Sequence, residues 1–373
     1  MMVGTGVACA QDRGARDGLR LVVLVPAYNE ADSIGATLAA VLDQTRPADL
    51  VVAIPNGCTD DTAAVARSFG VEVMELARLE HKKSEALNLA WDAYARDADV
   101  VICLDADTAL PSNALADWVR ELDGDPTLGG SSSKFTMRGR DYLTRLQRAE
   151  FAAWTDTALR RGNTTVLAGT GCAISGKALR DVVARTGQPG PWSYASLTED
   201  WLLTYEIRRL GYRCHVSPTV RAYTDSMRTH RALLGQRMKW QVGTVEDLLR
   251  VGVNRYTALD WWQQFAGLAM AALRIAWALL VVALLLTGTF TPSLLWWVAV
   301  PAIFALGQGL LTLRIPHRDW MDVVLGFAIL PAEHFAWLRA YWFLRGWGKA
   351  LRSHFTGKQE DLWAAQSVAE IAN

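Results

Sequence analysis

Two aspartates separated by one residue, Asp105 and Asp107, directly follow the apolar run 100–104. Side chains at positions i and i+2 of an extended chain point to the same side, so both carboxylates can face one ligand. Carboxylate oxygens suit Mg2+ or Mn2+, and such a cation can neutralise the charge that develops on a diphosphate leaving group. The pair therefore predicts a site for Mg2+ or Mn2+, with two solvated loop aspartates as the alternative.

A second acidic group, Thr198-Glu199-Asp200, stands at the start of a helix predicted over 199–210. One interpretation is a helix cap, in which Thr198 caps the first turn and the acids lie near the positive end of the helix. The other interpretation is catalytic. Asp200 would then be a general base that removes the proton of an attacking hydroxyl group.

A third group, Gln236 to Trp240 (QRMKW), lies in a basic amphipathic stretch that runs from Met227 to Leu249. Gln236 and Trp240 are four residues apart and share one face of a helix. A helix that lies on anionic lipid explains such a pattern. The alternative is a functional site on this face of the helix.

The elements around these groups predict an α/β fold. Apolar runs at 21–26, 50–54, 71–76 and 100–104 alternate with helical patterns at 31–44, 59–69 and 84–95. This alternation predicts a Rossmann-like, mostly parallel sheet with helices on both faces. Ligands of such sheets bind at the carboxyl ends of the strands, where Asn56 and Asp105 lie. Residues 130–225 show a less regular pattern.

The last third of the chain is apolar and predicts a membrane module. The stretches 265–287 and 293–313 are each long enough to cross a bilayer, which takes about 20 helical residues. A third stretch, 322–344, carries several polar residues and is expected to lie in the interface or re-enter rather than span. Arginines flank the two spans on the same side, which places the N-terminal half in the cytoplasm.

One charged residue, Arg274, interrupts the first predicted span. A charge within a membrane segment marks a functional position by default. Arg274 is expected to face a polar path or to pair with Glu333 of the third stretch. The alternative is that the helix begins after Arg274, or that its side chain reaches back to the membrane interface.

Composition excludes several classes of protein. Lys and Arg together number 38, as do Asp and Glu, so the chain lacks the basic excess of a general nucleic-acid binder. The five cysteines include no CxxC pair, which argues against a disulfide framework and against a zinc site. We therefore predict no nucleic-acid partner and a reducing compartment for the N-terminal half.

The motifs gain weight from their order: VPAYNE at 25–30, NGCTDD at 56–61, KSEALN at 83–88, then DAD, TED and QRMKW. In this order the sequence resembles glycosyltransferase family 2, whose fold is termed GT-A. It looks most like the membrane-embedded branch of poly-N-acetylglucosamine, hyaluronan, chitin and cellulose synthases. The resemblance covers residues 20–345.

The resemblance implies an inverting transfer of sugar from a nucleotide-sugar donor, expected to be a UDP-sugar, to a glycan or to a lipid-linked acceptor. It assigns donor contacts to Ala27, Tyr28, Glu30, Asn56, Lys83 and Asp105, the metal ion to Asp107, the catalytic base to Asp200, and acceptor or diphosphate contacts to Glu199, Gln236, Arg237, Lys239 and Trp240. Membrane lipids are implied as further partners.

Two positions depart from the family pattern. Pro55-Asn56 replaces an aspartate pair that helps to hold the nucleotide base and ribose, and Lys239 replaces an arginine. Lysine keeps the charge but lacks the planar fork that binds phosphate through two hydrogen bonds. Three functions therefore stay open: a polysaccharide synthase, a transferase that adds a single sugar to a lipid or lipid-linked acceptor, and an inactive membrane scaffold that binds a nucleotide sugar.

The predicted organisation has five parts. They are a flexible tail at 1–20, a cytoplasmic catalytic domain at 21–225, an amphipathic interface segment at 226–262, a membrane module at 263–344 and a basic cytoplasmic tail at 345–373.

Overall fold

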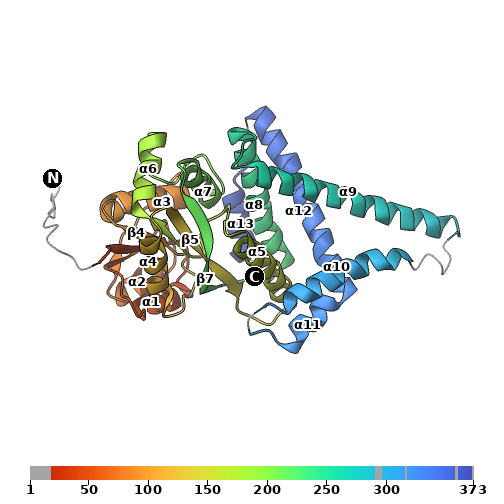
Figure 1. Cartoon of the computed structure of the whole chain (residues 1–373), viewed down its shortest axis with the longest axis horizontal. Helices are drawn as coiled ribbons and strands as arrows, with labels where there is room; N and C mark the ends of the chain where they lie inside the picture. The colour runs from red at the N-terminus through yellow and green to blue at the C-terminus, as the bar shows by residue number, and fades with distance from the viewer. Residues whose placement is uncertain (1–17, 290–295, 316, 358–359, 372–373) are drawn as a thin grey trace.

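The computed structural model describes residues 18–289, 296–315, 317–357 and 360–371. An α/β half comes first along the chain, and long helices extend away from it (Figure 1). The predicted N-terminal tail at 1–20 lies outside the described residues except for 18–20.

The α/β half is built on one seven-stranded sheet with the order β3-β2-β1-β4-β6-β5-β7. The strands are β1 (Leu21–Ala27), β2 (Leu50–Pro55), β3 (Glu72–Val73), β4 (Val100–Cys103), β5 (Leu128–Met137), β6 (Cys172–Ser175) and β7 (Arg213–Thr224). Only β6 runs antiparallel to its neighbours β4 and β5, while the other pairs are parallel. The predicted mostly parallel sheet is confirmed.

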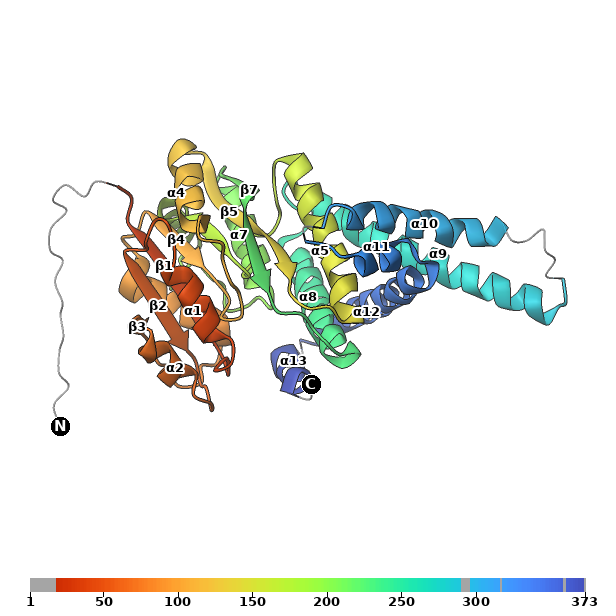
Figure 2. The same ribbon diagram turned by 90° about the horizontal axis from the view of Figure 1, so that it is seen from below.

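Helices cover both faces of this sheet, as the apolar runs predict (Figures 1 and 2). They are α1 (Ile34–Leu42), α2 (Thr62–Ser68), α3 (Lys82–Ala90), α4 (Ala114–Gly124), α6 (Gly176–Thr186) and α7 (Glu199–Arg209). Along β1, Val23 and Val25 pack with α1, α2 and α4, whereas Val22 and Leu24 pack with α3, α6 and α7. Both faces of the strand are apolar because both are buried.

Three elements differ from the prediction. The strand expected at 71–76 shrinks to β3, and Leu76 keeps a single bridge to Asn56. The helix expected at 84–95 ends at Ala90 and continues as a π-helical turn, η1 (Trp91–Ala95). A 20-residue helix, α5 (Tyr142–Arg161), forms where the pattern is irregular. Helix α5 has no clear amphipathic period in the sequence, because it buries polar residues as well as apolar ones.

Helices make up the rest of the chain: α8 (His230–Val251), α9 (Ala258–Leu286), α10 (Trp296–Thr312), α11 (Trp320–Phe327), α12 (Ile329–Thr356) and α13 (Leu362–Ile371). The boundary expected at 344 falls inside α12, and the segment expected to be a tail contains α13.

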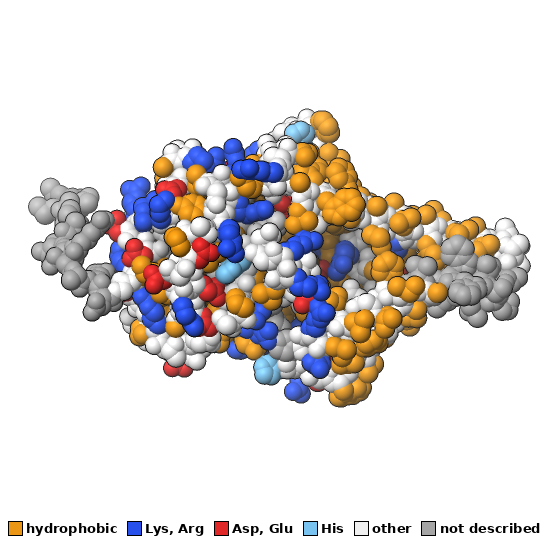
Figure 3. Space-filling view, in the orientation of Figure 1, with side chains coloured by type: hydrophobic (Ala, Val, Ile, Leu, Met, Phe, Trp, Pro, Cys, Tyr) orange, Lys and Arg blue, Asp and Glu red, His pale blue; other side chains and the backbone are white. Residues whose placement is uncertain are grey.

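Within the described residues, α9 is long and apolar enough to cross a membrane, with a mean hydropathy of 2.4 in its most apolar window. The pair α11–α12 adds a second crossing if the two helices, bent by 71° at their junction, form one span. The stretch expected to span at 293–313 begins outside the described residues, and Pro301–Thr312 within it is a shorter apolar helix. Apolar side chains gather on these extended helices, and charged ones on the α/β half (Figure 3).

One ion pair joins α9 to α12, between Arg274 and Glu333. Both side chains are largely buried, at 13% and 17% exposure. The pairing expected for Arg274 is confirmed.

A second group of ion pairs fastens α5 to the start of α11. Asp322 is almost fully buried and accepts hydrogen bonds from Arg145 and Arg148, each at 3.0 Å.

The substitution Asp322→Ala would leave these arginines with fewer partners. Because unpairing buried charges is costly, we expect the free energy of unfolding to fall by about 3 kcal/mol, measured as a lower melting temperature in detergent. Asp92→Ala, in an exposed pair with Arg96, is the control and should change stability by less than about 1 kcal/mol. Equal effects of the two substitutions would contradict this expectation.

Candidate active site

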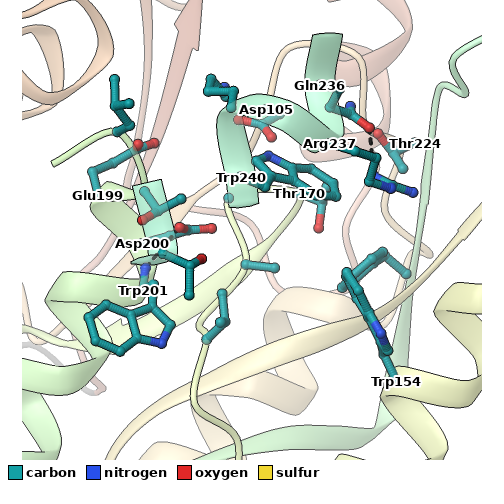
Figure 4. Close-up of a pocket in the computed structure, with 18 of the residues that line it drawn as sticks. Asp105, Trp154, Thr170, Glu199, Asp200, Trp201, Thr224, Gln236, Arg237 and Trp240 are labelled. Atoms are coloured by element: carbon teal, nitrogen blue, oxygen red, sulfur yellow. Dashed lines mark hydrogen bonds between the residues drawn. The ribbon is translucent and has the colours of Figure 1, made fainter. Parts of the chain in front are cut away.

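One cavity of about 1040 Å3 lies at the carboxyl ends of β1, β2 and β4 and reaches to α5, α7, α8, α9 and α12. It brings together every residue that the sequence assigns to the site: Ala27, Tyr28, Glu30, Asn56, Lys83, Asp105, Asp107, Glu199, Asp200, Gln236, Arg237, Lys239 and Trp240. Figure 4 shows Asp105, Asp200 and Trp240 around the same open space, although they come from three separate parts of the chain.

The floor of the cavity carries a cluster of acids. Asp107 accepts hydrogen bonds from the hydroxyl groups of Thr108, at 3.0 Å, and Thr224, at 3.2 Å to each carboxylate oxygen. Burial, together with the negative charges of Asp105 and Asp225, raises the pKa of Asp107 to about 7. Proton uptake or a bound cation can relieve this charge repulsion.

The donor set fits Mg2+ or Mn2+, because every acidic ligand here is a hard oxygen. Among the described residues, no group of three or more His, Cys, Asp or Glu is arranged to hold a metal ion. A cation held by Asp107 and its neighbours would therefore need further ligands from outside this acidic cluster. The oxygens of a diphosphate are such ligands, and Mg2+ usually binds through one or two carboxylates plus substrate phosphates.

Lys83, on α3, connects Asp105 to Glu199 across the cavity. Its ammonium lies 2.5 Å from Asp105 Oδ1 and 3.5 Å from Glu199 Oε1. Burial opposes the charge, but Asp105 and Glu199 outweigh it and hold the pKa of Lys83 above its ordinary value. Gly169 permits this approach, since a Cβ there would lie 2.7 Å from the nitrogen. Lys83 is therefore a fixed cation inside the cavity.

Asp200 stands in the first turn of α7 with its carboxylate in the cavity. Burial and the adjacent Glu199 raise its pKa to about 6, which suits a base that works near neutral pH. The helix-cap interpretation is wrong for Thr198, whose hydroxyl donates to Asp247 at 3.0 Å and makes no cap hydrogen bond to α7.

The QRMKW stretch lies on α8 and faces the cavity. Arg237 donates to Glu150 of α5 at 2.8 Å and to Gln236 at 2.7 Å, and its guanidinium lies 4.4 Å from the ring centroid of Trp240. Lys239 lies over the ring of Trp363. Arg237 and Lys239 are only 3% and 6% exposed. The alternative in which these two cations lie on a lipid surface is therefore wrong.

The ends of β1 and β2 form the side of the cavity that the resemblance assigns to the nucleotide. Ala27 is buried and Tyr28 is partly exposed at the rim. The Glu30 carboxylate accepts a hydrogen bond from the hydroxyl group of Ser33. The backbone N–H of Glu30 donates to the hydroxyl oxygen of Thr62 at 2.8 Å. The Asn56 amide donates to the carbonyl of residue 82 and accepts from the N–H of residue 79, both at 3.1 Å. Asn56 thus shapes the loop that leads to Lys83.

The cavity also contains residues that the sequence does not assign to the site, among them Glu150, Trp154, Asp225 and Trp363. Asp225 directly follows β7, and its position after a strand could have identified it. Glu150 and Trp154 belong to the unpredicted helix α5, and nothing in the sequence near Trp363 indicates its place. The places of Glu150, Trp154 and Trp363 therefore depend on tertiary packing.

A family model described as "Glycosyltransferase like family 2" matches residues 19–243, more than half of the chain. The chain belongs to glycosyltransferase family 2. It is therefore an enzyme of the class that the resemblance implies, acting on a nucleotide-sugar donor.

Curated relatives include poly-beta-1,6-N-acetyl-D-glucosamine synthases of two staphylococci. Identity is 25% over 233 residues with the Staphylococcus epidermidis protein and 27% over 232 residues with the protein of Staphylococcus aureus strain MSSA476. The matches cover 61% and 62% of this family 2 chain, and 55% and 56% of the relatives. The chain thus spans little more than half the length of these relatives.

Among solved structures, a mannosyltransferase from Pyrobaculum calidifontis in complex with GDP-Man and Mn2+ aligns with a TM-score of 0.62 and 20% identity. The alignment covers 90% of this chain and 87% of that one. The chain therefore has the GT-A fold followed by C-terminal helices.

Proposed function

We propose that this enzyme is an inverting, metal-dependent transferase that moves a sugar from a UDP-sugar to a hydroxyl group of a glycan acceptor at the cytoplasmic face of a membrane. The observation that carries the proposal is the shared cavity of Asp105, Asp107 and Asp200, with Lys83 connecting the two sides. It unites a cation site, a cationic bridge and a base of raised pKa. An inverting displacement needs a base for the attacking hydroxyl group and positive charge at the leaving group.

In this mechanism the carboxylate of Asp200 accepts the proton of the acceptor hydroxyl as its oxygen attacks the anomeric carbon. The bond from that carbon to the diphosphate breaks on the opposite face, and the nucleoside diphosphate leaves. A cation held by Asp107 would stabilise the charge on the leaving group. Lys83 adds a second positive charge, and Trp240 offers an aromatic surface for the acceptor sugar.

A lipid-linked acceptor is the second candidate, favoured by the far end of the cavity. There the lining includes Gly267 of α9 together with Trp342 and Phe343 of α12. Because α9 carries the candidate membrane span, an apolar chain that enters between these helices would bring its sugar head group towards Trp240. Product length distinguishes the candidates, because a polysaccharide synthase gives a ladder of products and a single transfer gives one added sugar.

The direct test incubates membranes that contain the protein with radiolabelled UDP- and GDP-sugars and with Mn2+ or Mg2+. We expect turnover with one or more UDP-sugars, and loss of turnover when EDTA removes the cation. Turnover restricted to GDP-sugars would exclude the UDP donor but keep the reaction. Nucleotide binding without metal-dependent release of nucleoside diphosphate from any donor would instead identify an inactive scaffold.

A further inference from the structure

A short C-terminal segment, residues 360–366, lies against the cavity, although 124 positions separate Trp363 from the cavity residue Lys239. Figures 1 and 2 show α13 beside α8. Leu362 is 5% exposed and packs with Val242 and Val245 of α8. The next residue, Trp363, lines the cavity.

Two ion pairs anchor this segment. Asp361 forms an ion pair with the ammonium of Lys82 at 2.5 Å, and Glu360 forms one with Lys349 of α12. Lys82 adopts a left-handed backbone conformation, with φ of 50°, immediately before the donor-side residue Lys83. The segment therefore connects α3, α8 and α12 around one end of the cavity.

Trp363 meets a particular cation of the cavity. The Lys239 ammonium lies 3.2 Å from the centroid of the Trp363 ring, and Lys239 is nearly buried. The face of an indole ring attracts a cation. A lysine side chain carries a point charge on a flexible stem, whereas an arginine presents a pre-organised fork. The Trp363 ring therefore restricts the positions that the Lys239 ammonium can adopt, which the flexible lysine stem alone would not do.

We infer that Trp363 is a positioning residue, which holds Lys239 where its charge meets the diphosphate of the donor. This inference rests on the proposed function, because it takes the anion in the cavity to be a nucleoside diphosphate. It assigns the C-terminal segment to the donor site. In this arrangement Trp363 and Lys239 act as one unit.

The test uses the full chain in detergent or membranes and measures both the KM for the donor and the affinity for UDP with Mn2+. Trp363→Ala is expected to raise the donor KM and the UDP Kd by about tenfold with a much smaller change in kcat. Trp363→Phe, which keeps an aromatic face, is expected to stay within about threefold of the parent protein. Phe355→Ala, at an exposed position on α12, is the control and should change neither value.

Rescue separates positioning from a loss of packing. Introducing Lys239→Arg into the Trp363→Ala protein should restore most of the UDP affinity, because the guanidinium orients itself without the ring. Failure of this rescue, an unchanged UDP affinity in Trp363→Ala, or faster transfer in that variant would each overturn the inference. If the parent protein turned over no donor, the proposed function would fail, while UDP affinity would still decide the role of Trp363.

Discussion

Replacing Asp200 with asparagine is expected to reduce kcat by about 1000-fold, within the range of roughly 100- to 10,000-fold typical of a missing general base. Asparagine keeps the shape of the side chain but cannot accept the proton of the acceptor hydroxyl at neutral pH. The donor should still bind, so the UDP Kd is expected to change by less than about threefold. Transfer rates and UDP binding, measured on one preparation, test both parts.

The matched control is Asp181→Asn, which changes a partly exposed aspartate on α6 that pairs with Lys177. It should leave kcat unaffected. A transfer rate near that of the parent protein in Asp200→Asn would remove Asp200 from the role of base. Weaker UDP binding with an unchanged kcat would make it a binding residue instead.

The pH dependence gives an independent check on Asp200. A base must be deprotonated to work, and the pKa of Asp200 is raised to about 6. The value of kcat/KM should therefore fall about tenfold for each pH unit below 6. Glu199 contributes to the raised pKa through its negative charge, so Glu199→Gln should move this decline to lower pH. A decline that stays in place would mean that another group titrates.

Replacing Asp107 with asparagine is expected to lower kcat by at least about 100-fold, because metal-ion catalysis supplies several kcal/mol of charge stabilisation. The physical reason is the loss of a buried carboxylate from the acidic cluster that Asp107 forms with Asp105 and Asp225. A titration with Mn2+ should show a higher half-saturating concentration, read from UDP binding as well as from transfer.

Asp225→Asn is the graded comparison for Asp107. Asp225 acts on Asp107 through its charge, so its neutralisation should weaken the Mn2+ response by less, about tenfold or below. Equal losses in the two variants would place Asp225 among the direct ligands. Undiminished Mn2+ dependence in Asp107→Asn would move the cation elsewhere in the cavity.

The sheet and much of the site could be predicted because they follow from local pattern. Apolar runs that alternate with helices fix a parallel sheet, and its carboxyl ends must share one edge. Asn56 and Asp105 consequently line the same cavity although 49 positions separate them. The first turn of α7 could be placed too, since its helix is correctly predicted from residue 199.

The rest depends on packing that no local pattern encodes. In α5, Gln147 and Glu150 are buried, so the amphipathic period is lost and the helix escapes detection. The cation–π contact of Lys239 joins segments 124 positions apart. For the same reason the basic face of α8 looks solvent-exposed in the sequence, although Glu150 neutralises Arg237 inside the protein.

Helix α5 carries two kinds of contact along one rigid rod. Arg145 is fastened to the start of α11, and Trp154 lines the cavity. At 1.5 Å per residue these positions are about 14 Å apart along the axis. In the proposed membrane setting, a helix rather than a flexible linker thus fixes the distance between the wall of the cavity and the start of α11. This fixed distance would then select acceptors by the position at which they present their hydroxyl group.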